Sequence, residues 1–156
     1  MIRLLALALV ASCSWLPPDT PPQKPAPIDP DVKALVHPWQ VENHVLSNSP
    51  AISDADARAM HGRKVEITAT GYRTPFTGTC DDATHTRHDL VFADLLDRLN
   101  LGPDAREVAI HFGFGDPIVE YDLACGGDRH STDLVIYISG DRAMTCATGA
   151  CYLLAY

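Results

Sequence analysis

The chain has 156 residues, of which 46% are hydrophobic and 21% charged, enough for one ordinary core and too few for two large domains. This composition excludes a wholly disordered protein. Twelve Lys and Arg oppose 20 Asp and Glu, so the formal charge is -8, and a basic surface for nucleic acid or anionic lipid headgroups is not expected.

The first thirteen residues have the pattern of an export signal. Arg3 precedes an apolar run over residues 4–10 that is too short to cross ~30 Å of hydrocarbon as a helix. Small residues and a cysteine follow, and the sequence Val10-Ala11-Ser12-Cys13 resembles the lipobox of bacterial lipoproteins. The alternative is an ordinary secretory signal that contains a cysteine.

The resemblance implies that a signal peptide of residues 1–12 is removed and that Cys13 carries acyl chains, palmitate among them. Several acyl chains anchor a protein stably to its membrane. Ser14 rather than Asp follows the cysteine, which in this class implies the outer membrane, with the protein facing the periplasm of a bacterial cell envelope.

A proline-rich stretch follows. Residues 16–30 hold seven of the chain's 12 prolines, a composition that favours an extended, semi-rigid polyproline II spacer. Residues 13–30 are therefore interpreted as a lipidated tether, in which the proline-rich part, at ~3.1 Å per residue, would reach about 45 Å. A proline-rich ligand for a partner domain is the alternative. A single folded domain is expected over residues 31–156.

The first elements predicted in this domain are a short helix and a strand. Ser53 precedes acidic residues and alanines, which is typical of a capped helix start, and Gly62 ends a helix predicted over about 53–61. Alternating apolar and polar residues predict a strand over 64–72. A loop is expected over 72–88.

The longest predicted helix covers about 89–101. Apolar residues recur there at spacings of three and four, and Gly102-Pro103 ends the pattern. The rest of the chain has alternating or continuous apolar runs, which predict strands. These strands are expected over 107–114, 117–125, 133–139, 142–146 and 150–156.

These elements predict an α+β fold. A mostly antiparallel, twisted or partly closed sheet of five to seven strands is expected to pack on one main helix at about 89–101. The short helix at about 53–61 is the second helix of this arrangement.

Apart from Cys13, the chain has four cysteines, an even number that favours two disulfides in an exported chain. Cys146 and Cys151 flank a four-residue turn that would bring their thiols together. This predicts Cys146–Cys151 and, by elimination, Cys80–Cys125. A four-thiolate zinc site is disfavoured because the chain has no Cys-x-x-Cys pair.

Two histidines are weak candidate metal ligands. His85 and His88 are three residues apart and follow Asp81 and Asp82, so a helix would place both imidazoles on one face beside carboxylates. The stretch is expected to be a loop that leads into a helix, where such spacing constrains little. No metal site and no cofactor are therefore predicted.

A loop tip with aromatic residues is a candidate contact for a partner. Tyr72, Arg73 and Phe76 would form this tip, although Phe76 fits a core position equally well. Removal of residues 1–12 takes away Arg3, so that 11 basic residues oppose 20 acidic ones and the charge becomes -9. An acidic surface suits a cationic partner.

No nucleophile elbow or phosphate-binding glycine loop occurs in the chain, and no catalytic residue is predicted. We expect a non-enzymatic, membrane-anchored periplasmic lipoprotein that binds another protein, as an inhibitor or immunity protein against a wall-degrading enzyme or toxin. The alternatives are an accessory subunit of an envelope assembly or secretion machine, a metal-binding protein that uses His85 and His88, and an unrecognised hydrolase.

Overall fold

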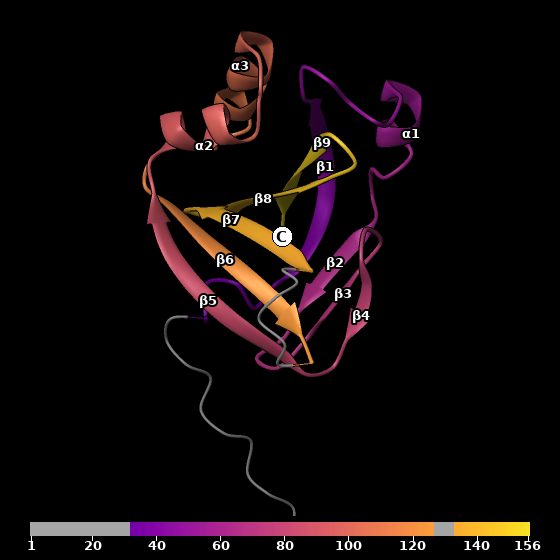
Figure 1. The fold of residues 1–156 in the computed structure, drawn as a ribbon, viewed down its shortest axis with the longest axis vertical. Helices are drawn as coiled ribbons and strands as arrows, with labels where there is room; N and C mark the ends of the chain where they lie inside the picture. The colour runs from indigo at the N-terminus through magenta and orange to yellow at the C-terminus, as the bar shows by residue number, and fades with distance from the viewer. Residues whose placement is uncertain (1–31, 127–132) are drawn as a thin grey trace, which may run out of the picture.

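Nine antiparallel strands form one sheet in the computed structural model, which describes residues 32–126 and 133–156. The strand order is β4-β3-β2-β1-β9-β8-β7-β6-β5, and the sheet curls into a nearly closed barrel (Figure 1). The strands are β1 (Pro38–Leu46), β2 (Lys64–Ile67), β3 (Tyr72–Thr74), β4 (Gly78–Cys80), β5 (Ala83–Leu90), β6 (Ile118–Cys125), β7 (Leu134–Ser139), β8 (Arg142–Ala147) and β9 (Ala150–Ala155).

In the described part of the chain, three short helices accompany the sheet: α1 (Asp54–Arg58), α2 (Phe92–Arg98) and α3 (Pro103–His111). The Ser53 Oγ accepts a hydrogen bond from the Asp56 backbone N–H at 3.2 Å and caps α1, as the sequence predicted. Figure 1 shows α2 and α3 together at one end of the barrel. Among the described residues, no helix has both the length and the apolar character needed to span a membrane.

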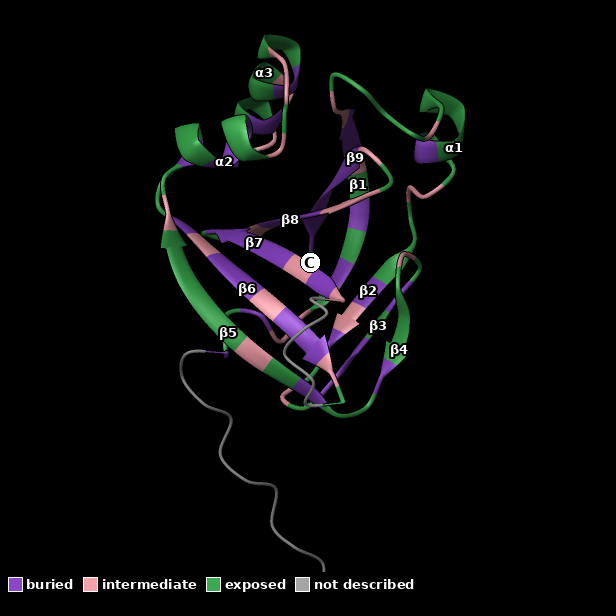
Figure 2. Ribbon diagram, in the orientation of Figure 1, coloured by how far each residue is buried: buried purple, intermediate pink, exposed green. Residues whose placement is uncertain are grey.

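Two hydrophobic cores result, one on each side of the barrel wall. Alternate residues of the strands point inward and fill the interior, with Trp39, Leu123, Ile136 and Leu154 at its centre. The opposite face of the central strands packs on α2 and α3. All six residues of β9 are buried, because this strand lies between the two cores (Figure 2).

Both predicted disulfides are present. Cys80–Cys125 links the end of β4 to the end of β6, with the two Cα atoms 5.8 Å apart. Cys146–Cys151 joins facing residues of the β8–β9 hairpin, with the Cα atoms 4.0 Å apart. Gly149 in this turn has a φ of +79°, and an added Cβ would lie 2.7 Å from the Cα of Pro50, so the turn requires glycine.

The predicted fold class is wrong in strand number and in its main helix. The sheet has nine strands rather than five to seven, and no single helix covers 89–101. Much of the expected loop over 72–88 is strand, and β5 extends to Leu90, so that α2 begins only at Phe92. The eight residues of β5 all face residues of β6, and this pairing outweighs the helical spacing at the start of the predicted helix.

Two further elements differ from the prediction. The expected strand over 107–114 lies largely in helix α3, where Ala105 and Ala109, four residues apart, are buried against the second core. Strand β1 was not predicted. Its register shifts between Val41 and Asn43, and this irregularity interrupts the alternation that marks a strand. Helix α1 is also shorter than the predicted helix over 53–61.

Candidate binding site

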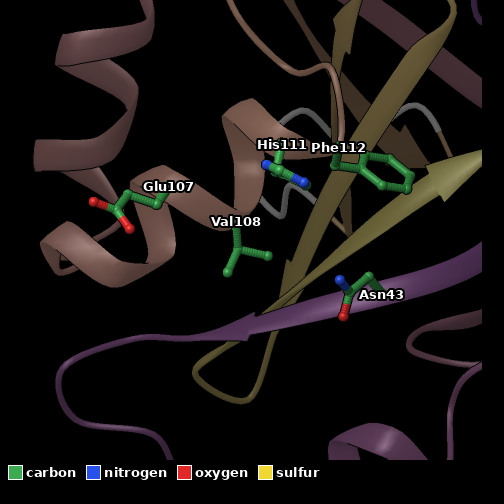
Figure 3. A pocket seen from close by; sticks show the side chains of 5 residues that line it. All are labelled: Asn43, Glu107, Val108, His111 and Phe112. Atoms are coloured by element: carbon green, nitrogen blue, oxygen red, sulfur yellow. The ribbon is translucent and has the colours of Figure 1, made fainter.

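A hollow lies between helix α3 and strand β1. Its volume is about 420 Å³, and Figure 3 shows Val108 between the helix and the strand that carries Asn43. It is lined by Asn43, Glu107, Val108, His111 and Phe112.

Helical spacing sets the helix side of this hollow. Glu107 and His111 are four residues apart on α3, and Phe112 at the C-cap follows Val108 by four residues, so two adjacent rows of side chains border the hollow. The guanidinium carbon of Arg142 lies 5.0 Å from the centre of the Phe112 ring and supports it by a cation–π contact.

The strand side depends on the irregularity in β1. After the register shift, Asn43 lines the hollow, while its Oδ1 accepts a hydrogen bond from the His44 backbone N–H at 2.8 Å. Within residues 32–126 and 133–156, no hydrogen bond or ion pair involves the side chains of Glu107 or His111. A carboxylate, an imidazole and two apolar side chains are therefore available to a ligand.

A second group of polar side chains ties helix α1 to the barrel. His44 on β1 is buried, with its side chain only 5% exposed, and both of its ring nitrogens have partners. The Nε2 atom lies 3.0 Å from Asp54 Oδ1, and the Nδ1 atom lies 2.9 Å from His61 Nε2. Arg58 also donates to Asp54, at 3.1 Å. These contacts position α1 and the turn after it, and no nucleophile is part of the chain of hydrogen bonds.

Protonation affects this arrangement in a predictable direction. Burial, followed by the charges of His44 and Arg58, lowers the pKa of His61. The hydrogen bonds from Arg58 and His44 lower the pKa of Asp54. When both imidazoles are protonated, neither nitrogen at the contact between His44 and His61 can accept, so the hydrogen bond is lost.

We expect the free energy of unfolding to fall as the pH drops below about 6.5, the ordinary pKa of His61. The unfolded chain binds the proton more tightly than the folded one, so the stability is complete above that pH and is lost as the pH falls through the lowered value. Urea denaturation at pH 8 and pH 5 measures the difference. The loss of stability between pH 8 and pH 5 is expected to be smaller in His61→Gln than in the unaltered protein and the same in His111→Gln. A loss in His61→Gln equal to that of the unaltered protein contradicts the role of His61.

The two weak metal candidates do not form one site. They lie on β5, and a spacing of three on a strand places side chains on opposite faces. The Nε2 atom of His85 is buried without a hydrogen-bond partner in the described parts of the chain, and burial lowers the pKa of His85. His88 lies on the other face, where its Nε2 is 3.4 Å from Asp122 Oδ2.

His88 belongs to a different cluster from the one predicted. With Glu120 and Asp122 it offers three ligand atoms that lie within 4.8 Å of one another, and neither Asp81 nor Asp82 takes part. Two acidic residues at alternate positions of the apolar strand β6 were the sequence signal that could have indicated it.

An ion pair already occupies this cluster. The buried carboxylate of Glu120 accepts a hydrogen bond from Arg98 of α2. Burial, followed by the charge of Glu120, raises the pKa of Tyr137 on the neighbouring strand to about 12. Because Arg98 neutralises Glu120, a metal ion would have to displace it, and the arrangement fits a contact between α2 and the sheet.

The aromatic residues of the predicted loop tip lie in the barrel interior. Tyr72 is 4% exposed, and the Phe76 ring stacks on Tyr152 with their centres 4.4 Å apart. Only Arg73 is exposed, 3.7 Å from Glu66. The two rings therefore do not form an exposed tip. Cys13, the predicted lipidation site, lies outside the described residues.

Comparison of the chain with protein-family models, with curated proteins and with solved structures finds no match.

Proposed function

We propose that this protein is a membrane-anchored periplasmic lipoprotein whose domain binds a cationic protein without catalysing a reaction. The observation that carries the proposal is the hollow between α3 and β1, which combines apolar side chains with the carboxylate of Glu107, a group that pairs with no other described residue. Such a combination accepts a Lys or Arg side chain, because the carboxylate pairs with the charge while Val108 and Phe112 contact the aliphatic part.

The barrel supports this site as a rigid platform. Large interior side chains, among them Trp39, Leu123 and Tyr152, are almost completely buried, and the two disulfides tie the strands together. Preorganisation of this kind lowers the entropic cost of binding.

The charge of the chain favours a basic partner. The formal charge is -8, and an acidic surface accelerates encounter with a cationic protein. Together with the predicted export and lipid anchor, this supports an inhibitor or immunity protein against a basic wall-degrading enzyme or toxin of the envelope. The proposed partner class is thus one of basic, secreted or periplasmic hydrolases.

The proposal predicts a loss of binding when the hollow is altered. Glu107→Lys places a positive charge where a basic side chain would enter, and we expect affinity to fall at least about a hundredfold. The measurement is calorimetric titration of basic wall-degrading enzymes with the full chain, together with their rate of cell-wall lysis.

The matched control is Asp81→Lys, which makes an equal change of sign at an exposed residue next to β4, at the other end of the barrel. This variant is expected to retain binding within about twofold, as is usual for changes outside an interface. Equal loss in the two variants would show a general charge effect and would contradict the hollow as the site. Absence of binding and inhibition across the enzymes would contradict the proposed partner class.

A further inference from the structure

The sheet has two ends, and they differ sharply in length. At one end lies β4, which has three residues, and at the other lies β5, which has eight. All eight residues of β5 face residues of β6 in an unbroken register. Within the described parts of the chain, no strand pairs with the other side of β5, where only the N–H of its first residue, Ala83, is bonded, to the Thr70 carbonyl at 2.8 Å.

A long regular edge is unusual because it offers its backbone groups to another chain. Proteins protect edge strands by shortening them, by bulges, by proline or by charged side chains. The edge at β4 is protected by its length, whereas β5 contains no proline and its pairing with β6 shows no bulge. The edge at β5 is therefore suited to accept a further strand whose charges complement those of β5.

Most side chains of β5 are exposed, on both faces of the strand. Thr84, Thr86 and His88 alternate along one face, with Arg87 and Asp89 on the other, and all five are exposed (Figure 2). Arg87 and Asp89 form an ion pair of 2.7 Å at the end of the strand, with side chains 42% and 73% exposed. Their charges are thus available to a neighbouring strand.

The charge pattern selects one partner and one register. In an antiparallel pair, two facing residues either both point their N–H and C=O groups at the other strand or both point them away from it. When two identical strands pair symmetrically, the sequence numbers of facing residues are therefore both odd or both even. A pair centred on Arg87 or on Asp89 would place like charges opposite each other. A pair centred on His88 instead places Arg87 opposite the Asp89 of the second copy, twice by symmetry.

We propose that two copies of this chain associate through antiparallel pairing of their β5 strands, with His88 at the two-fold axis and two reciprocal Arg87–Asp89 contacts. The occupant of the edge is a second copy, because the strand is complementary in charge to itself in this register. The resulting sheet continues from one barrel into the other. This association is independent of the hollow between α3 and β1.

Sedimentation of the purified full chain in detergent over about 1–100 μM measures the association. Arg87→Asp and Asp89→Arg each create two like-charge contacts, and we expect each to weaken dimerisation at least about tenfold. The double variant Arg87→Asp/Asp89→Arg restores opposite charges in the same register and is expected to dimerise as the unaltered chain does. Arg73→Asp, which makes the same change at an arginine on β3 whose side chain is 70% exposed, is the matched control.

A photo-crosslinking residue at position 88 tests the axis directly, since it would join the two copies to each other. Dimers that the double variant restores, with cross-links at position 88, support the proposal. A chain that stays monomeric over the whole concentration range overturns it, as does a dimer that is insensitive to both single variants. Cross-linking of position 88 only to a different envelope protein would show that a partner, and not a second copy, occupies the edge.

Discussion

Replacement of Cys80 and Cys125 by alanine is expected to lower the free energy of unfolding by about 4 kcal/mol, on the chain-entropy estimate for a loop of this size. The disulfide closes a loop of 45 residues and links β4 to β6, near the two ends of the sheet. Its loss frees the unfolded chain and also releases the contact that holds these ends near each other. Urea denaturation of both proteins measures the change.

The second disulfide provides the control. Cys146 and Cys151 are only five residues apart in the chain, so Cys146→Ala/Cys151→Ala removes a short constraint and should cost about 2 kcal/mol. The hairpin also remains paired through its backbone ladder. A larger loss from the short loop than from the long one would contradict this account of the barrel.

Trp39→Ala is expected to destabilise the protein by about 3–5 kcal/mol, the range for removal of a large buried ring. Trp39 is completely buried in the barrel interior, and its Nε1 donates a hydrogen bond to the Leu35 carbonyl at 3.0 Å. Its ring also meets the rings of His37 and Tyr156 edge to face. Alanine would leave a cavity and would remove one of the two hydrogen bonds that the Leu35 carbonyl accepts, the other coming from the His37 backbone N–H at 3.0 Å.

Urea denaturation followed by circular dichroism tests this prediction, because the spectrum does not depend on the tryptophan fluorescence that the substitution removes. Trp39→Phe keeps a ring in the core and should cost clearly less than alanine, while Val91→Ala changes a residue that is 51% exposed and should stay within about 0.5 kcal/mol. If all three variants have equal stability, Trp39 does not contribute to the core as described.

The C-terminal third of the domain was the part that the sequence predicted best. Strands β6 to β9 pair with their neighbours in sequence order, so each apolar run and the turn after it carry the information that is needed. The Cys146–Cys151 disulfide follows from the same local geometry. The expected strands over 117–125, 133–139, 142–146 and 150–156 therefore agree with the structure to within a few residues.

Elsewhere the prediction was wrong because packing between distant parts of the chain decided the structure. Residues 107–114 alternate as a strand would, yet they lie mostly in α3, where the second core buries Ala109 and leaves Ile110 more than half exposed. Phe76 and Tyr72 come from the expected loop, but they face the barrel interior because β3 pairs with both β2 and β4. Such choices depend on elements distant in sequence.

The two proposed binding surfaces could not be predicted from the sequence either. The hollow joins Asn43 of β1 to three residues of α3 and to Phe112 at its C-cap, and neither segment carries a motif that points to the other. The edge at β5 is visible only once β5 is known to end the sheet.

The amino-acid sequence by itself thus determined the antiparallel C-terminal strands, the capped start of the short helix and the pairing of four cysteines, because each depends on neighbours in the chain or on simple counting. Tertiary structure alone decided the number of strands, the helical state of residues 103–111 and the positions of the hollow and the free edge. The physical reason is that burial against a second core and pairing with distant strands contribute more free energy than the intrinsic helix or strand propensity of the residues concerned.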